Sequence, residues 1–186
     1  MKQRTDTNLV IVEPHADDAF LSLHDHILEW VREGNHVCIV TPSSEPRRMR
    51  EAEAYARKVG ADWMEFKSGD TLPTGQLVLP LGIKHHDHTR VRRTFDAPAA
   101  WFYLDMPYAL VQRDGDLVAS AMRGLEVVSF LKPHGRKWQD LKIFESQSSY
   151  FSMYHRDEQL KNAAFELILR RASPIRHASR STTRGG

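Results

Sequence analysis

The segment with the clearest chemical potential is 14–18, which reads Pro-His-Ala-Asp-Asp. His15 and Asp18 are close enough in sequence to hold one metal ion together across a turn, whereas Asp17 between them need not be a ligand. Two adjacent aspartates in such a place can instead cap a helix and favour its dipole. This segment alone supports metal binding and helix capping about equally.

A second segment, 85–88, reads His-His-Asp-His. Imidazole is the commonest zinc ligand, and a carboxylate beside it fixes its tautomer and raises its basicity. A merely polar loop is the alternative interpretation. Together the two segments offer a His/Asp/His set with an open fourth position, which is typical of catalytic zinc. Such a set also fits a non-haem iron(II) triad, although the surrounding pattern disfavours an oxygenase and leaves iron as an alternative metal in a hydrolytic site.

The apolar pattern around these segments predicts alternating strands and helices. We expect strands over 8–13, 36–41 and 62–66, and helices from Asp17 to Gly34 and over 47–59. This alternation predicts an α/β fold, a Rossmann-like three-layer sandwich with a mostly parallel sheet in one compact domain. In such sheets ligands bind beyond the carboxyl ends of strands, which is where segment 14–18 falls.

The second half of the chain is less regular. Pro80 makes 77–83 an edge strand or an extended loop. Further strands are predicted over 100–104 and 124–131, and closing helices over 136–148 and 156–171. The last residues are polar and basic without an apolar period, so we expect a folded domain over 1–172 and a flexible basic tail over 173–186.

The composition is that of an ordinary soluble protein, with 186 residues, 41% hydrophobic and 27% charged residues and a net charge of +2. Cys38 is the single cysteine, so no disulfide framework exists. With no stretch suited to a signal peptide or a membrane span, we expect a cytoplasmic protein. Nucleic acid is not an expected partner, because only the tail is strongly basic and would make weak, salt-sensitive contacts. The oligomeric state is left open.

Segment 14–22, Pro-His-Ala-Asp-Asp-Ala-Phe-Leu-Ser, resembles the first motif of the PIG-L (LmbE-like) family of zinc-dependent N-acetylglucosaminyl deacetylases. It is most similar to the branch with P-H-x-D-D-A-x-L-S. Segments 80–82 and 85–88 match the P-L-G and H-x-D-H motifs of that branch. Weaker matches, in chain order up to about residue 150, are Arg48, Glu51, Gly60, the aromatic-acidic-Pro-Tyr segment 102–108, and Lys137, Leu141, Phe144, Ser146 and Gln147.

The resemblance implies a metal-dependent hydrolase that removes an N-acetyl group from an amino-sugar conjugate by attack of a metal-bound water. It implies zinc, with iron(II) as the alternative, held by His15, Asp18 and His88. Zinc lowers the pKa of its water to about 7 and polarises an amide carbonyl. Alternative substrates are another acylated small molecule or a thiol-sugar conjugate, and a function of a different class is a nucleic-acid-associated protein that uses the basic tail.

The resemblance also implies the remaining roles at the site. Asp17 would be the general base, and His85, tuned by Asp87, would stabilise the oxyanion or protonate the leaving amine. Contacts with the substrate would come from Arg48, Tyr103 and Tyr108. For Arg48 the alternative is an ordinary surface arginine on a helix.

The chain departs from the family pattern in three places. His24 and Asp25 stand where Gly-Gly is common, and we expect them to narrow the pocket or change the acceptor. Ile83 and Lys84 replace a frequent glycine and asparagine before the second motif, and the stretch from 66 to 80 lacks a helix-strand unit that many members carry. The other histidines, such as His24 and His26, are interpreted as surface residues.

Overall fold

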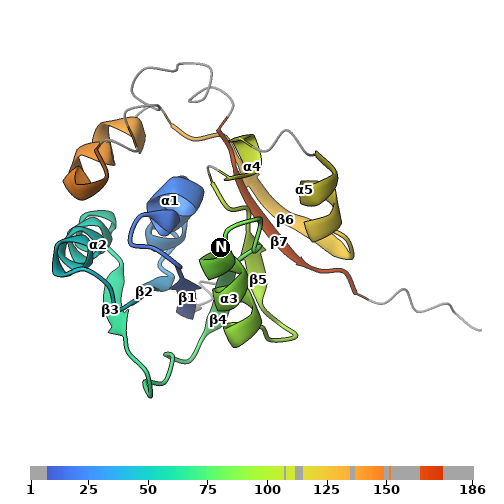
Figure 1. The fold of residues 1–186 in the computed structure, drawn as a ribbon, viewed down its shortest axis with the longest axis horizontal. Coiled ribbons are helices and arrows are strands. Elements are labelled where there is room, and N and C mark those ends of the chain that lie inside the picture. Colours follow the sequence, from blue (N-terminus) through green and yellow to red (C-terminus); the bar gives the residue numbers. More distant parts are fainter. Residues whose placement is uncertain are drawn as a thin grey trace, which may run out of the picture.

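The computed structural model describes residues 8–106, 108–111, 115–134, 137–148, 151 and 164–173. Within these residues, seven strands form one sheet in the order β3-β2-β1-β4-β5-β7-β6 (Figure 1). All neighbouring strands from β3 to β5 are parallel, and β7 runs antiparallel to both of its neighbours. The predicted single α/β domain with a mostly parallel sheet is therefore confirmed.

The strands are β1 (Asn8–Val12), β2 (His36–Pro42), β3 (Asp62–Phe66), β4 (Gln76–Pro80), β5 (Trp101–Tyr103), β6 (Leu125–Leu131) and β7 (Glu166–Arg171). The α-helices are α1 (Asp18–Arg32), α2 (Pro46–Val59), α3 (His86–Phe95), α4 (Tyr108–Val111) and α5 (Gly115–Ala121), and two 3₁₀ segments are η1 (Lys137–Ile143) and η2 (Glu145–Gln147). No helix in this described part of the chain is long and apolar enough to cross a membrane.

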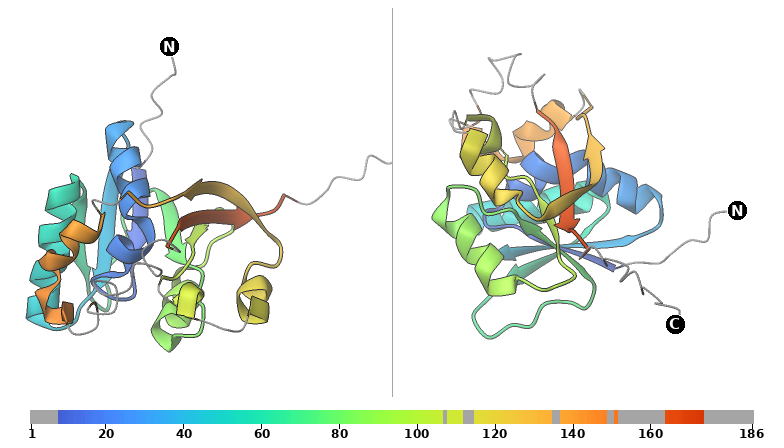
Figure 2. Two further views of the ribbon diagram at one scale, coloured as in Figure 1. Left: turned by 90° about the horizontal axis from the view of Figure 1, so that it is seen from above. Right: turned by 90° about the vertical axis from the view of Figure 1, so that its right-hand side faces the viewer.

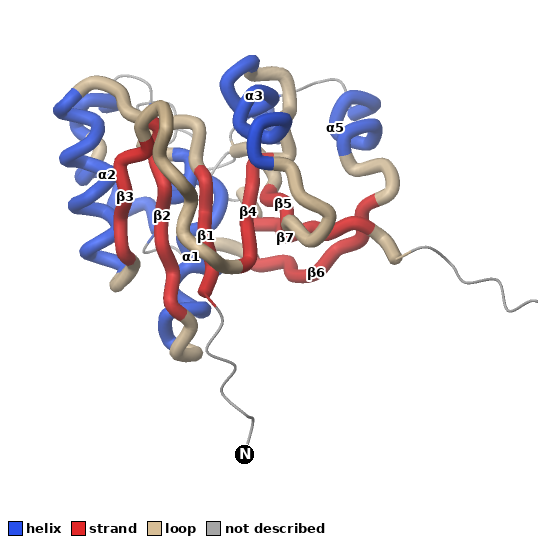
Figure 3. Tube along the Cα trace, turned by 90° about the horizontal axis from the view of Figure 1, so that it is seen from below, coloured by secondary structure: helices blue, strands red, loops and turns tan. Residues whose placement is uncertain are grey.

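The first half follows the predicted pattern of strand, helix, strand, helix and strand. Figure 3 shows α1 and α2 together on one side of the strands, with α3 and α5 apart from them. Gly60 ends α2 in the left-handed region, with φ +78°, and a Cβ there would lie 3.2 Å from Val31 of α1. Glycine is therefore required both by the backbone and by the close approach of the two helices.

The prediction that 77–83 forms an edge strand or a loop is wrong, because β4 lies in the middle of the sheet between β1 and β5. Pro80 is the last residue of β4 and pairs only with Tyr103 of β5, whereas pairing with β1 ends at Val78. The missing N–H of the proline thus falls beyond the ladder with β1. Because β1 and β4 are parallel neighbours, the chain leaves both strands at the same end of the sheet.

The closing helix predicted over 136–148 is confirmed in part, because 137–143 and 145–147 are helical, although of the 3₁₀ type. The helix predicted over 156–171 is wrong where the chain is described. Residues 166–171 form β7, whose Leu167, Ile168 and Leu169 are buried, as in a central strand covered on both faces. Residues 137–143 and 145–147 form the 3₁₀ helices η1 and η2, and buried Leu141 and Phe144, the latter between the two, follow the three-residue spacing of such a helix. Residues 156–163 lie outside the described part.

A buried ionic cluster ties η1 and β7 to α1, which lies between them in the left view of Figure 2. Lys137 Nζ donates to Glu166 Oε1 at 2.8 Å and to the Leu21 carbonyl at 2.7 Å. His26 Nδ1 lies 3.1 Å from Glu166 Oε2, so its interpretation as a surface histidine is wrong. Burial opposes the charge on Glu166, but Lys137 and His26 outweigh it and lower its pKa to about 2.

Candidate active site

A cavity of about 160 Å³ opens where the chain leaves β1 and β4. The strand order reverses direction at this point, since β2 and β3 lie on one side of β1 while β4 and β5 lie on the other. Such switch points leave a crevice beyond the strand ends. The lining residues are His15, Asp17, Asp18, Leu21, Arg48, His85, Tyr108 and Gln147. Six of the nine residues predicted for the site are among them.

The turn after β1 is closed by its own hydrogen bonds. Asp18 Oδ2 accepts the backbone N–H of His15 at 2.8 Å and lies 3.2 Å from Nδ1 of the same residue. In return, the Asp18 N–H donates to the His15 carbonyl at 3.1 Å. Burial opposes ionisation of Asp18, but His88 and His15 outweigh it, so its pKa lies well below the usual range. Asp18 is thus an anion held against two imidazoles.

Neither aspartate makes a side-chain capping bond to α1, although Asp18 lies in the first turn, where an acid favours the helix dipole. Asp17 occupies the N-cap position without a side-chain hydrogen bond to the helix. Instead, Glu13 accepts the N–H of Ala19 at 2.9 Å and the hydroxyl of Thr41 at 2.6 Å. Burial raises the pKa of Glu13 well above its ordinary value. Sequence reasoning missed this residue, whose signal was a carboxyl group at the end of an apolar strand.

His88 is completely buried, with a carboxylate facing each ring nitrogen. Nε2 lies 3.3 Å from Asp18 Oδ2, and Nδ1 lies 3.4 Å from Asp105 Oδ1. Burial disfavours charge on His88, but Asp18 and Asp105 outweigh it and raise its pKa to about 10. The site therefore stabilises a positive charge at this position. Asp105 was matched only as part of the segment 102–108, and its role beside His88 was missed.

The loop after β4 turns sharply to present His85. Gly82 has φ +84° and Lys84 has φ +58°, so the loop contains a non-glycine residue in the left-handed region. His85 Nδ1 then accepts the N–H of Asp87 at 3.3 Å, which caps α3. With Nδ1 an acceptor, the proton of the neutral ring lies on Nε2. Burial and the neighbours His15 and His88 lower the pKa of His85.

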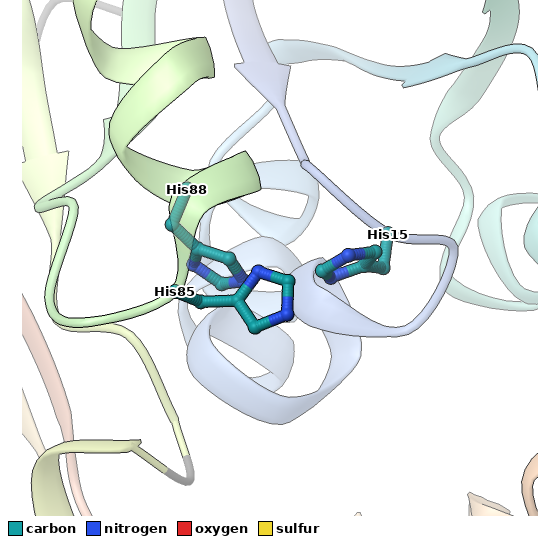
Figure 4. Close-up of side chains that lie close together, drawn as sticks. All are labelled: His15, His85 and His88. Carbon is teal, nitrogen blue, oxygen red and sulfur yellow. The ribbon is translucent and has the colours of Figure 1, made fainter.

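Three imidazoles lie close together beside the cavity (Figure 4), and two of them, His15 and His85, line it. His15 comes from the turn after β1, and His85 and His88 come from the start of α3; one nitrogen of each lies within 4.8 Å of the others. Asp18 contacts two of these rings. Both His88 nitrogens are buried without a hydrogen-bond partner among the described residues. Nitrogen and carboxylate donors in this arrangement fit a divalent ion such as zinc or iron(II). The predicted ligands His15, Asp18 and His88 thus lie together, and the ring of His85 is about as close to the two histidines as they are to each other.

Asp87 lies between the two segments of the site. Its Oδ2 is 3.3 Å from His15 Nε2 and 3.8 Å from His85 Nδ1. Its Oδ1 is 2.8 Å from the guanidinium of Arg90. Burial opposes ionisation, but His15 and Arg90 outweigh it and lower the pKa of Asp87. The Asp87 carboxylate thus lies closer to the ring of His15 than to that of His85, whose basicity it was expected to adjust.

Arg48 reaches the cavity from α2 and donates to Asp17 Oδ1 at 3.2 Å. Burial and the neighbouring Asp18 raise the pKa of Asp17 to about 6, against the opposing effect of Arg48. One turn further along α2, Glu51 accepts the backbone N–H of Ser146 at 2.8 Å. That contact anchors η2, which contributes Gln147 to the lining.

Two expectations about the pocket are wrong. Tyr103 is fully buried, and its hydroxyl donates to the Val12 carbonyl at 3.3 Å, so this residue belongs to the core and does not line the cavity. His24 is buried 3.2 Å from the Tyr55 hydroxyl, and Asp25 accepts the His134 N–H at 2.7 Å; neither lines the cavity. Tyr108, by contrast, lines it, with its ring centroid 5.4 Å from that of His85.

The sequence matches no family profile and no curated protein sequence. Among solved structures it is similar to the A40926 pseudoaglycone deacetylase Dbv21, with 21% identity, a TM-score of 0.57, and coverage of 90% of this chain and 99% of that chain. It is also similar to the N,N'-diacetylchitobiose deacetylase of Pyrococcus horikoshii, with 14% identity, a TM-score of 0.52, and coverage of 93% and 89%.

A third similar structure is that of GalB, the 4-carboxy-2-hydroxymuconate hydratase of Pseudomonas putida. The identity is 15% and the TM-score 0.53, over 81% of this chain and 83% of that one. At these identities the likeness establishes the fold, which is shared by deacetylases and by a hydratase. The reaction must therefore be argued from the site itself.

Proposed function

We propose that the chain is a metal-dependent hydrolase that removes an N-acetyl group from an amino-sugar conjugate. The observation that carries the proposal is the cluster of His15, Asp18 and His88, in which Asp18 contacts both imidazoles. His15 and Asp18 line one cavity together with two further ionisable groups, Asp17 and His85, and His88 is buried behind them. The resemblance to PIG-L deacetylases and the deacetylases among the structures of similar fold support the reaction class.

His15, Asp18 and His88 would hold the metal, zinc or alternatively iron(II). When bound there, the ion supplies a Lewis acid that activates water and polarises an amide carbonyl. Asp105 faces the Nδ1 side of His88 at 3.4 Å and so keeps Nε2 directed toward Asp18. The contact between Asp18 and the His15 N–H fixes the carboxylate of Asp18 relative to the turn.

Asp17 would act as the general base that accepts a proton from the attacking water. Arg48, 3.2 Å from Asp17 Oδ1, holds this carboxylate at the cavity wall. The water oxygen forms a bond to the acyl carbon as the proton passes to Asp17. A carboxylate in this role typically contributes about 10²–10⁴-fold to the rate.

His85 would stabilise the oxyanion that forms when water attacks the acyl carbon. Because its Nδ1 accepts the Asp87 N–H, the Nε2–H of the neutral ring can donate a hydrogen bond to that oxygen. Asp17 would pass the proton taken from the water to the amine nitrogen as the C–N bond breaks. The products are acetate and the free amine. Tyr108 packs beside His85 and closes that wall of the cavity.

The cavity suits a small acyl group better than a long one, because its volume is about 160 Å³. The rest of the conjugate would extend out of the cavity, whose lining includes the polar side chains of Arg48 and Gln147. We infer a small-molecule substrate. We also propose that the enzyme works in the reducing cytoplasm, because its single cysteine, Cys38, is buried in the core and forms no disulfide.

The test combines metal analysis with acetate release from a panel of N-acetylated amino sugars. Wild type should contain about one ion per chain, and His15→Ala and His88→Ala should lose it together with activity. His36→Ala is the matched control, since His36 is an exposed histidine paired with Asp62 at 2.8 Å, away from the cavity. Full metal occupancy in both site variants would overturn the ligand assignment. A metal-loaded wild type that releases acetate from no sugar would overturn the deacetylase assignment.

A further inference from the structure

We propose that His85, which lines the cavity, forms a second, outer metal site together with the adjacent His86 and Asp87. One donor atom from each of the three residues lies within 4.8 Å of the other two. His86 Nε2 is 3.2 Å from Asp87 Oδ1, and His85 Nδ1 is 3.8 Å from Asp87 Oδ2. The donors are two imidazoles and one carboxylate, a set suited to zinc and to similar divalent ions.

The outer group is held by the backbone around the start of α3. His85 is the N-cap of α3, and His86 and Asp87 occupy its first turn. The rings of His85 and His86 stack with their centroids 5.0 Å apart. The side chain of His86 is 81% exposed, so an ion from solvent reaches it without any opening of the protein.

Two features should make this site bind a metal more weakly than the inner site, which is formed by His15, Asp18 and His88. Arg90 lies 2.8 Å from Asp87 Oδ1 and competes with a metal for that oxygen. The N-terminus of α3 also carries the positive end of the helix dipole, which disfavours a cation. The inner group has opposite properties, because His88 is buried and faced by Asp18 and Asp105. The outer site should therefore fill only after the inner one.

His85 is a donor of the outer group, and it also lines the cavity beside the proposed inner ligands His15, Asp18 and His88, so the two sites are coupled through one side chain. On the basis of the proposed function, an ion on the outer site would engage His85 and Asp87 and remove the hydrogen-bond donor that stabilises the oxyanion. Excess metal should therefore inhibit the enzyme, while a single ion supports activity. The proposed ligand of the outer site is a divalent cation that binds both imidazole and carboxylate groups, and Zn²⁺ is the probe.

Binding is tested by equilibrium dialysis of the full chain against increasing Zn²⁺. Wild type should reach about two ions per chain, and His86→Phe, which keeps a stacked ring but no nitrogen, should stop at about one. Arg90→Ala should bind the second ion more tightly than wild type, because the competing cation is gone. His36→Ala controls for the loss of an exposed histidine and should still bind as wild type does. A plateau of one ion in wild type, or of two in His86→Phe, would overturn the proposal.

Activity gives a second readout that separates this proposal from the proposed function. Wild type and His86→Phe should have the same rate at one equivalent of Zn²⁺, but only wild type should lose activity in excess. Equal inhibition of both proteins would overturn the regulatory role of the outer site. If neither protein hydrolyses any substrate while dialysis still gives two ions against one, the outer site stands and the deacetylase function falls.

Discussion

The guanidinium of Arg48 lies 3.2 Å from Oδ1 of Asp17, so the proposed base is already paired with a cation from another helix. Asp18, the next residue, instead faces His15 and His88. Adjacent carboxylates thus have separate partners. This separation fits the two roles proposed for these residues, proton transfer for Asp17 and metal binding for Asp18.

Exchange of either aspartate should separate these roles. Asp17→Asn should retain the metal and lose about 10²–10⁴-fold in turnover, because the proton acceptor is gone. Asp18→Asn should lose the metal, because it removes the charge that faces two imidazoles. Metal analysis and steady-state kinetics of both variants check this. Loss of the metal from Asp17→Asn would mean that the two residues have been assigned the wrong way round.

Asp105 should act through His88 without touching the substrate. Asp105→Asn keeps an acceptor for the Ile83 N–H but removes the charge beside His88 Nδ1. Metal affinity should fall by about 10–100-fold, as is typical for the loss of a carboxylate behind a ligating histidine. Competition with a chelator measures it, and Asp62→Asn, at an exposed surface pair, is the control. Unchanged affinity in Asp105→Asn would rule out this positioning role.

Lys84 should limit the stability of the loop that presents His85, since its φ of +58° costs a residue with a Cβ about 1 kcal/mol. Lys84→Gly should raise the free energy of unfolding by about that amount, offset in part by the greater entropy of glycine in the unfolded chain. Lys84→Ala keeps the Cβ and should show no such gain. Chemical denaturation of the three proteins decides, and equal stability of the glycine and alanine variants would contradict the explanation.

The Glu166 cluster predicts how stability depends on pH. The pKa of Glu166 is about 2 in the folded chain and 4.5 ordinarily, so its contribution is complete above pH 4.5 and disappears as the pH falls toward 2. In Glu166→Gln the free energy of unfolding should depend less on pH below 4.5. At neutral pH it should be about 3–5 kcal/mol lower than in wild type, because Lys137 stays buried without its partner. Glu126→Gln, which removes an exposed pair with Arg170, is the control and should change little.

We propose that residues 173–186 are dispensable, with the domain ending at 172. β7 ends at Arg171, and the Ala172 N–H still donates to the Gly124 carbonyl at 3.0 Å. A chain that stops at Ala172 should fold and deacetylate a small sugar at nearly the full rate. A large loss of activity with an intact fold, and a steep salt dependence in the full chain, would instead indicate that the tail holds an anionic substrate.

Sequence patterns predicted the first half of the fold because its signals are local. Apolar runs, helical spacing and Gly60 specify β1 to β3 without reference to the rest of the chain. The position of β4 and the identity of β7 could not be predicted in this way. They depend on which strands become neighbours, and the apolar run 167–169 suits a buried helix as well as a buried strand.

The same distinction applies to the site. The segments 14–18 and 85–88 could be picked out because their residue types and spacing are chemically unusual, and the choice of His88 within the second segment came from the resemblance to the PIG-L family. Asp105 and Glu13 support them from the end of β5 and the end of β1, and only tertiary structure brings their carboxylates to His88 and to α1. The prediction for Tyr103 was wrong for the opposite reason. The aromatic and acidic residues around it in the sequence are typical of a pocket wall, but its position on β5 places it in the core.

The contact between β1 and β4 has a consequence for how the molecule assembles. His15 and Asp87 are 72 positions apart in the chain and meet only after these strands pair. An ion shared by the two segments would therefore close a long loop, and it would bind only to the folded chain. It would thus hold the amino-terminal and central parts of the protein together. Removal of the ion should lower the melting temperature and let the two parts separate more readily.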